Sequence, residues 1–273
     1  MKSIRNLILL FLILPLTGFS QKDVLKIAYG NEPQQILDLF LPANVSDKTP
    51  VAIFIHGGAW SLGDRYYTDS HAKKLRDRGI VVANIEYRYV SPTLDHKGLE
   101  KDVSDAIAKV KSLSPEYNFR NSAYHIIGIS AGAHLALMQA YLHPSETKSV
   151  TSICGPVRFN TEESRDFIAK LGLSKTIEML AGSRYANGKP DTKFTDISPY
   201  SIVKKVPTLL IHGTKDELVL YSNAMFMKEV LEKHHVENKL ITIEGAGHSA
   251  GMDKPESEAK NLDEIEKWIR KYD

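Results

Sequence analysis

The sequence predicts an α/β fold, in which a mostly parallel sheet of about eight strands is covered by helices on both faces. Eight short apolar runs bounded by turn residues fall at 24–29, 36–41, 51–56, 80–86, 124–129, 149–153, 206–212 and 239–243. From the third run onward they are rich in Val and Ile and lack strict alternation, as in parallel strands buried on both faces. Helical patterns lie between them, and this alternation is typical of a doubly wound sheet.

The first two runs are joined by the short segment YGNEPQQ, which leaves no room for a helix. We therefore expect an antiparallel hairpin there. Apolar residues recur at helical spacing in two later stretches, at Leu99, Val103, Ala106, Ile107, Val110 and Leu113, and at Leu262, Ile265, Trp268 and Ile269. The interval 155–200 breaks the alternation and contains two short helical patterns, EESRDFIAKLG and KTIEMLAG. We expect a cap-like insertion over the carboxyl edge of the sheet, where open α/β sheets bind ligands.

Residues 1–20 have the pattern of a signal peptide. Lys2 and Arg5 precede the apolar run LILLFLIL, and the small residues Gly18 and Ser20 follow at the positions that a signal peptidase reads. The apolar core is about eight residues long, against the ~20 needed to span a bilayer. We expect cleavage near Ser20, a single domain over 21–273, and a mature chain that is secreted or periplasmic and not bound to a membrane.

The composition is that of a folded protein, with 42% hydrophobic and 25% charged residues. Without Lys2 and Arg5 the basic residues equal the 33 acidic ones, so the mature chain is neutral. A neutral chain with no basic run gives no case for nucleic acid as a partner. The one cysteine, Cys154, has no partner for an internal disulfide and no metal or redox motif around it. We expect it to be a small core residue, and we expect neither a metal nor a cofactor.

The segment HIIGISAGAHLAL, residues 125–137, places Ser130 where a strand pattern meets a helix pattern. A turn this tight forces the serine into a strained backbone conformation, and its neighbours must lack bulk so that the helix can pack back on the strand. Gly128 and Gly132 provide that space. The arrangement is that of a nucleophile elbow, which projects the serine hydroxyl from the edge of the sheet in front of the free N–H groups of a helix start.

A serine hydroxyl needs a base to take its proton, and the base needs a carboxylate to orient it. With an elbow of this kind both come from loops after later strands, in the order Ser, Asp or Glu, His. The run VPTLLIHG is followed by Asp216, and the run KLITIEG is followed by His248. We predict that Ser130, Asp216 and His248 form a catalytic triad, with Glu217 as the alternative acid.

The segment HGGAW, residues 56–60, follows the third strand run. Acyl transfer needs backbone N–H groups that stabilise an oxyanion, and glycines let the backbone approach closely. We predict an oxyanion hole formed by the N–H groups of Gly57, Gly58 or Ala59 together with that of Ala131.

Four other residues near these motifs receive supporting roles. His56 is expected to hold the HGG loop, His134 to pack on the helix after the elbow, and His212 to shape the turn before the acid. Trp60 is a candidate substrate-binding residue that either lines the acyl pocket or covers the core.

HGGAW, GISAGAHLA, HGTKDELV and GAGH, in this order over residues 51–250, resemble the α/β-hydrolase superfamily, and within it the esterases with an HGG-type oxyanion loop. IFIHGGAWSLGD, EYRYVSP and VPTLLIHGTKDELV are similar to secreted bacterial feruloyl and acetyl xylan esterases. HGGAW with SAGAHLA is equally similar to kynurenine formamidases. One departure is Ala59, where lipase-like relatives often have a third glycine; alanine keeps the N–H.

The resemblance implies a serine esterase that acts on short acyl or feruloyl esters of plant polysaccharide, and we expect acetyl esters to be preferred over octanoyl esters. A formamidase is the alternative reaction. A catalytically inactive hydrolase fold that serves as a binding protein is the alternative of another class, for which the sequence signal would be a broken triad. The residues of 155–200 that line the pocket cannot be assigned from the sequence.

Overall fold

Eight strands form one sheet in the computed structural model, which describes residues 20–185 and 192–273. The predicted leader lies outside the described residues, apart from Ser20. The strands are β1 (Lys22–Ala28), β2 (Ile36–Leu41), β3 (Val51–Ile55), β4 (Val81–Ile85), β5 (Tyr124–Ile129), β6 (Thr147–Ile153), β7 (Thr208–Gly213) and β8 (Asn238–Ile243). Each corresponds to one of the eight apolar runs, so the prediction of an eight-stranded sheet is confirmed.

The strand order is β1-β2-β4-β3-β5-β6-β7-β8. β1 pairs antiparallel with β2, as the short YGNEPQQ connection predicted, and β2 pairs antiparallel with β4. All other pairings are parallel. β8 differs from the prediction of strands buried on both faces, because it is an edge strand whose residues are all half-buried or exposed.

The helices are α1 (Tyr66–Arg76), α2 (His96–Tyr117), α3 (Ala131–Leu142), α4 (Glu162–Lys170), α5 (Ser174–Ala181), α6 (Thr192–Asp196), α7 (Ser222–Lys233) and α8 (Pro255–Tyr272), with short 3₁₀ turns η1 (Pro144–Glu146) and η2 (Pro199–Ile202). None of the helices in the described ranges is both long and apolar enough to cross a membrane.

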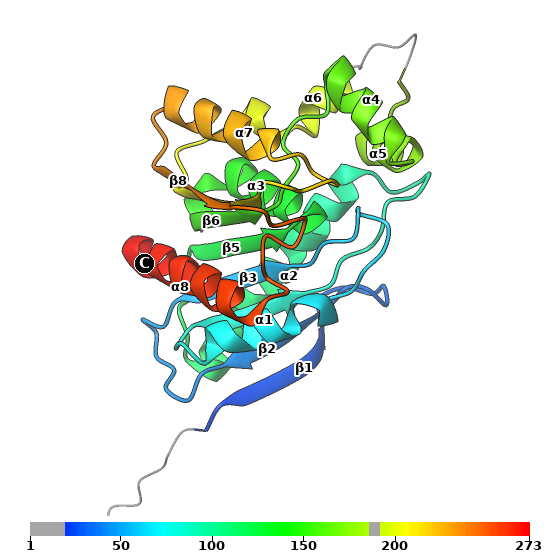
Figure 1. Cartoon of the computed structure of the whole chain (residues 1–273). Helices are drawn as coiled ribbons and strands as arrows, with labels where there is room; N and C mark the ends of the chain where they lie inside the picture. The colour runs from blue at the N-terminus through cyan, green and yellow to red at the C-terminus, as the bar shows by residue number, and fades with distance from the viewer. Residues whose placement is uncertain (1–19, 186–191) are drawn as a thin grey trace, which may run out of the picture.

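Two apolar layers separate the sheet from its helices. Alternate side chains of β3 point to opposite faces, so that Ile53 and Ile55 join one layer while Ala52 and Phe54 join the other. α2, α3 and α7 cover the first face, and α1 and α8 lie together on the second (Figure 1). The fold is therefore a doubly wound α/β sheet with helices on both faces.

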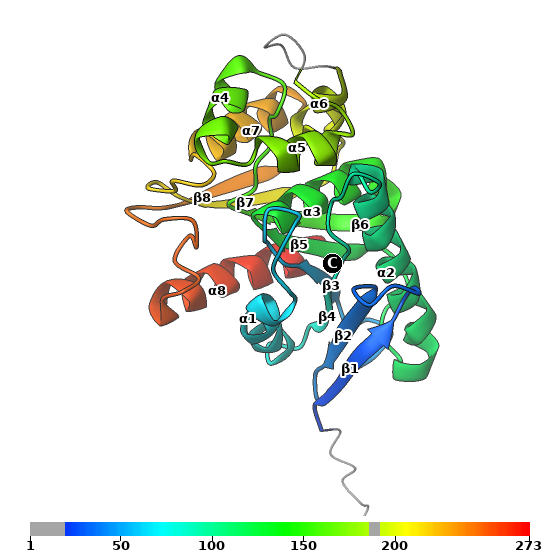
Figure 2. The ribbon, with the colours of Figure 1, turned by 90° about the vertical axis from the view of Figure 1, so that its right-hand side faces the viewer.

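Residues 155–185 and 192–200 form a cap beyond one end of the sheet, and α4 and α5 are its main helices (Figure 2). These two helices agree with the two patterns predicted in the sequence. Parallel strands place their carboxyl ends at one edge, and the register shows which ends meet: Ile55 lies beside Gly128, Ile129 beside Ile153, and Gly213 beside Ile243. The loops after β3, β5, β7 and β8 are thus brought together under the cap.

Candidate active site

Ser130 occupies the corner between β5 and α3. Its backbone has φ 55° and ψ −120°, a conformation that residues other than glycine rarely adopt. Its backbone N–H donates to the carbonyl of Ile153 at 2.8 Å, which holds the corner on the neighbouring strand. A Cβ on Gly128 would lie 2.1 Å from the Gly132 carbonyl oxygen, and one on Gly132 would lie 2.2 Å from the Ile55 carbonyl oxygen. Both glycines therefore permit the close packing of helix, elbow and strand that the sequence predicted.

The structure brings Ser130, His248 and Asp216 into one line of contacts. The Oγ of Ser130 lies 2.8 Å from Nε2 of His248, and the Nδ1 of His248 lies 2.8 Å from Oδ2 of Asp216. Asp216 is buried, whereas the neighbouring Glu217 is exposed and belongs to no contact of this line. Of the two acids considered from the sequence, Asp216 is the one that faces the histidine.

The carboxylate of Asp216 accepts hydrogen bonds on both oxygens. Oδ1 accepts from the backbone N–H groups of Leu218 and Val219, each at 2.9 Å, and Oδ2 faces His248 and Nε2 of His212, at 3.1 Å. Burial alone would raise the pKa of Asp216, but the hydrogen bonds from His212, His248 and Val219 hold it well below its ordinary value. The acid is therefore ionised and fixed in orientation.

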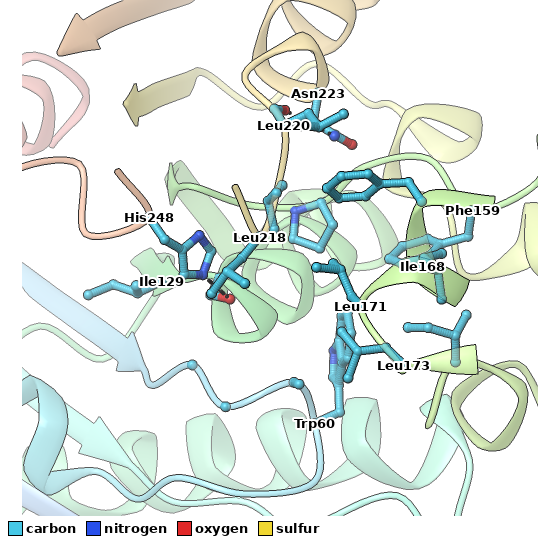
Figure 3. Close-up of a pocket in the computed structure, with 18 of the residues that line it drawn as sticks. Trp60, Ile129, Phe159, Ile168, Leu171, Leu173, Leu218, Leu220, Asn223 and His248 are labelled. Atoms are coloured by element: carbon cyan, nitrogen blue, oxygen red, sulfur yellow. Dashed lines mark hydrogen bonds between the residues drawn. The ribbon is translucent and has the colours of Figure 1, made fainter. Parts of the chain in front are cut away.

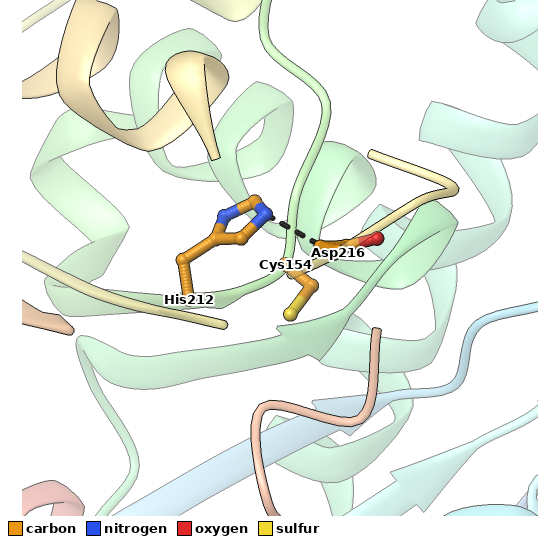
Figure 4. A group of neighbouring side chains, drawn as sticks. All are labelled: Cys154, His212 and Asp216. Atoms are coloured by element: carbon orange, nitrogen blue, oxygen red, sulfur yellow. Dashed lines mark ion pairs between the residues drawn. The ribbon is translucent and has the colours of Figure 1, made fainter. Parts of the chain in front are cut away.

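Cys154, His212 and Asp216 form a buried group whose potential ligand atoms lie within 4.8 Å of one another (Figure 4). A metal would need these atoms free, but Nε2 of His212 donates to the Val219 carbonyl at 2.8 Å, and Asp216 already has its own donors. Burial and the adjacent carboxylate raise the pKa of the Cys154 thiol, which opposes the thiolate that metals bind. Cys154 and His212 therefore pack beside the carboxylate of Asp216. His212 also bonds to the turn that contains Asp216, which agrees with the role predicted for it.

The loop after β3 packs directly against the elbow. A Cβ on Gly57 would lie 3.2 Å from the Cβ of Ser130. Gly58, Ala59 and Trp60 all have positive φ, and a Cβ on Gly58 would lie 1.8 Å from the Leu62 carbonyl oxygen. The backbone N–H groups of Gly58, Ala59 and Ala131 make no hydrogen bond within residues 20–185 and 192–273. The predicted oxyanion donors are thus adjacent to the serine and unpaired in that part of the chain.

His56 anchors this loop and does not face the serine. Its Nδ1 lies 2.6 Å from the Gly57 carbonyl oxygen, and its Nε2 lies 2.8 Å from a carboxylate oxygen of Glu86. The other oxygen of Glu86 accepts from the backbone N–H of Arg65 at 3.0 Å. This buried network ties the loop to β4 and to the start of α1, which agrees with the holding role expected for His56.

Trp60 and His134 meet behind the loop. The indole N–H of Trp60 donates to Nδ1 of His134 at 3.1 Å, and Nε2 of His134 donates to the carbonyl of Ile197 at 2.8 Å. Trp60 is buried and also lines the cavity beside Ser130, so it both covers the core and faces that cavity. His134 is a packed histidine, as expected, and it connects the HGG loop to the cap segment.

A cavity of about 530 Å³ opens beside Ser130 and His248 (Figure 3). The cap contributes lining residues that could not be placed from the sequence, such as Phe159, Ile168, Leu171 and Leu173. The segment after β7 contributes a second set that sequence reasoning missed, namely Leu218, Leu220, Asn223 and Phe226. The sequence does contain one sign of this lining, namely Leu218 and Leu220 in the turn after Asp216, because a turn that faces only solvent does not need leucines.

The mostly parallel sheet, the strained elbow at Ser130 and the chain order Ser, Asp, His define the protein as an α/β-hydrolase. More narrowly, the chain belongs to the BD-FAE family, whose match extends over residues 37–231.

Individual relatives have esterase and amidase names. The chain is 27% identical over 245 residues to a probable isoprenylcysteine alpha-carbonyl methylesterase, ICME, of Oryza sativa subsp. japonica, and this match covers 85% of the chain and 59% of the rice protein. It is 31% identical over 117 residues to a kynurenine formamidase of Danio rerio, which covers 43% of the chain and 38% of that protein. The chain therefore spans only part of the length of these relatives.

Among solved structures, a truncated form of a carbohydrate esterase from gut microbiota is similar, with a TM-score of 0.74 and 20% identity. The superposition covers 94% of this chain and 99% of the esterase. At this identity the likeness shows a shared fold.

Proposed function

We propose that the protein is a serine hydrolase that cleaves carboxylic esters through an acyl-enzyme. The observation that carries this proposal is the line of contacts from Ser130 through His248 to Asp216, with 2.8 Å at each step. The esterase names of relatives support it, and the complete line of contacts argues against an inactive hydrolase fold that only binds.

In this mechanism the Oγ of Ser130 attacks the ester carbonyl carbon while Nε2 of His248 takes the hydroxyl proton. The carbonyl oxygen becomes an oxyanion, which the N–H groups of Gly57, Gly58 or Ala59 and of Ala131 bind. His248 then gives its proton to the leaving alcohol oxygen as the C–O bond breaks. A water molecule repeats the sequence on the acyl-serine, which releases the acid and restores the hydroxyl.

Asp216 keeps the proton of His248 on Nδ1 and stabilises the imidazolium that forms during each step. Its low pKa keeps it negative throughout, because His212 and two backbone N–H groups also donate to it. The acid therefore acts as a fixed charge that does not exchange protons with His248.

For the alcohol, we propose an ester carried by an extracellular polysaccharide. The proposal rests on the export expected from residues 1–20 and on the resemblance of the HGG and elbow motifs to secreted esterases. Under this proposal the mature chain acts outside the cytoplasm.

A formamidase is the second candidate, and the similarity to the Danio rerio enzyme favours it. The same residues would act, but the departing aryl amine would need protonation by His248 as the bond breaks, whereas an alkoxide needs less help. We expect kcat/KM for esters to exceed that for N-formylkynurenine by at least about tenfold, or ~1.4 kcal/mol.

The test uses the purified chain, a fluorophosphonate probe, p-nitrophenyl esters and N-formylkynurenine. Ser130→Ala should lose probe labelling and at least about 10⁴-fold of kcat, since triad members act as a unit. Ser112→Ala, at an exposed position on α2, is the matched control and should match the parent. Undiminished ester turnover by folded Ser130→Ala would exclude the proposal.

A further inference from the structure

The cavity beside Ser130 is much larger than an acetyl ester requires. At about 530 Å³ it is more than three times the ~150 Å³ of a protein cavity that holds a benzene molecule. Pockets of this size take ligands of drug-like dimensions. The acyl group and the alcohol of an ester share this space, so the residues that line each part indicate what that part binds.

The part of the cavity under the cap, which we call the cap chamber, is lined by hydrocarbon. Ile168 belongs to α4, Leu171 and Leu173 lie between α4 and α5, and Phe159 precedes α4. Trp60 forms the floor and meets Phe159 edge to face, with ring centroids 5.8 Å apart. The chamber thus joins the HGG loop to the cap insertion.

Two polar side chains that line the cavity, those of Trp60 and Asn223, are already paired with other protein groups. The indole N–H of Trp60 donates to His134, away from the chamber. Asn223 accepts from the Val157 N–H at 3.2 Å and donates to the Leu220 carbonyl at 3.1 Å. An apolar group gains from burial against such walls, whereas a polar group would lose hydrogen bonds to water without replacement.

Arg158, a charged residue of the cap that lines the cavity, is also paired with protein groups. Arg158 lies over the ring of Phe226 at 4.6 Å and binds the carboxylate of Glu163 at 3.2 Å. Its charge is therefore balanced by the cap itself, and a substrate does not have to supply the partner.

The position of His248 indicates which part of an ester enters the cap chamber. The leaving oxygen must lie next to Nε2 of His248, because that nitrogen returns the proton. Figure 3 shows His248 at one end of the cavity and Phe159, Ile168 and Leu173 at the other, with Leu218 between. The group that extends away from His248 is the acyl group.

Residues outside the cap complete the lining of the cavity. They include Thr68 and His71 of α1, and Ser249 and Asp253 from the segment that follows His248. Because Ser249 is next to His248 in the chain, we expect the leaving alcohol to lie on this side.

We propose that the cap chamber is an acyl subsite built for an apolar acyl chain longer than acetyl, because its lining is hydrocarbon and it extends away from His248 (Figure 3). This inference rests on the proposed ester hydrolysis and deepens it. It reverses the order expected from the sequence, in which acetyl esters were preferred over octanoyl esters. The reason is physical: an acetyl group leaves the apolar walls of the chamber without a partner.

The experiment measures kcat/KM for a series of p-nitrophenyl esters from acetyl to dodecanoyl. Each methylene that enters the chamber is worth up to about fourfold, so hexanoyl to decanoyl esters should exceed acetyl by at least about tenfold. A preference for acetyl over octanoyl, with turnover that still depends on Ser130, would overturn this inference and leave the proposed function intact. Turnover that survives Ser130→Ala would instead overturn the proposed function.

Leu173→Trp tests the chamber directly, because this partly buried side chain lines the cavity and an indole would fill it. We expect octanoyl ester efficiency to fall at least about tenfold, with acetyl ester efficiency within about threefold of the parent. Leu142→Trp is the matched control, since Leu142 is 44% exposed at the end of α3 and does not line the cavity. It should leave the whole series unchanged.

A second series, acetate esters of methanol to octanol, tests which side of the ester the chamber holds. Leu173→Trp should leave octyl acetate unaffected. If octyl acetate falls as much as the octanoyl ester, the chamber holds the alcohol and the inference is wrong. Should Leu173→Trp fail to fold, as judged by thermal unfolding, Leu171→Phe takes its place with the same expected results.

Discussion

Acid should weaken the fold through His134, the buried histidine that joins the HGG loop to the cap. Its Nδ1 accepts from Trp60, and its Nε2 donates to Ile197, so both bonds require the neutral ring. A protonated ring would present an N–H to the indole N–H. Burial lowers the pKa of His134 to about 4, although the bond to the Ile197 carbonyl acts in the opposite direction.

The direction in which stability changes with pH depends on which state, folded or unfolded, binds the proton first. An unfolded histidine has a pKa of ~6.5, so as the pH falls the unfolded chain is protonated while folded His134 stays neutral. The stabilisation is fully present above ~6.5 and is lost as the pH falls toward the folded value of about 4. At about pH 4.5 the loss from this one group is about 2 to 3 kcal/mol. His134 is fully buried, so solvent does not screen it.

The assay compares the parent with His134→Gln, whose amide can accept from Trp60 and donate to Ile197 but does not titrate. Urea unfolding at about pH 7.5 and about pH 4.5 gives the free energy of unfolding of both proteins. The stability difference, parent minus variant, should fall by about 2 to 3 kcal/mol between the two conditions, because other titrating groups cancel in the comparison. A difference that stays constant with pH would refute the assignment of a neutral, bridging His134.

Two further predictions concern the catalytic line. Asp216→Asn should fold but lose about 10⁴-fold of kcat, because an amide cannot hold the required tautomer of His248. Glu217→Gln, at an exposed position, should match the parent in the same kinetic assay. The opposite ranking would assign the role of the acid to Glu217. Gly132→Ala should lower both the melting temperature and kcat, because the new Cβ would lie 2.2 Å from the Ile55 carbonyl oxygen and overpacking costs about 1 to 3 kcal/mol. A variant with parent stability would show that the elbow has free space.

The eight strands, the hairpin and the elbow could be predicted because each has a local cause. Apolar runs of Val and Ile cannot remain in water, and a strand that meets a helix at one serine needs Gly128 and Gly132 whatever surrounds it. The order Ser130, Asp216, His248 followed from which loops must lie at the carboxyl edge of a parallel sheet. The exposure of β8 was not predicted. It depends on the position of β8 at the edge of the sheet, and the residues of β8 do not indicate that position.

The lining and the volume of the cap chamber could not be predicted from the sequence and are seen only in the tertiary structure. Leu173 and Leu218 are far apart in the chain, and each reads as an ordinary apolar residue in a loop. They line one cavity because the cap folds over the edge where β7 ends, and its volume depends on how those segments pack. The fold class, the candidate nucleophile Ser130 and the order of its partners could be predicted from the sequence, because these depend on local backbone requirements and on strand order. The size and the apolar walls of the acyl subsite depend on contacts between distant segments, and only the folded chain contains them.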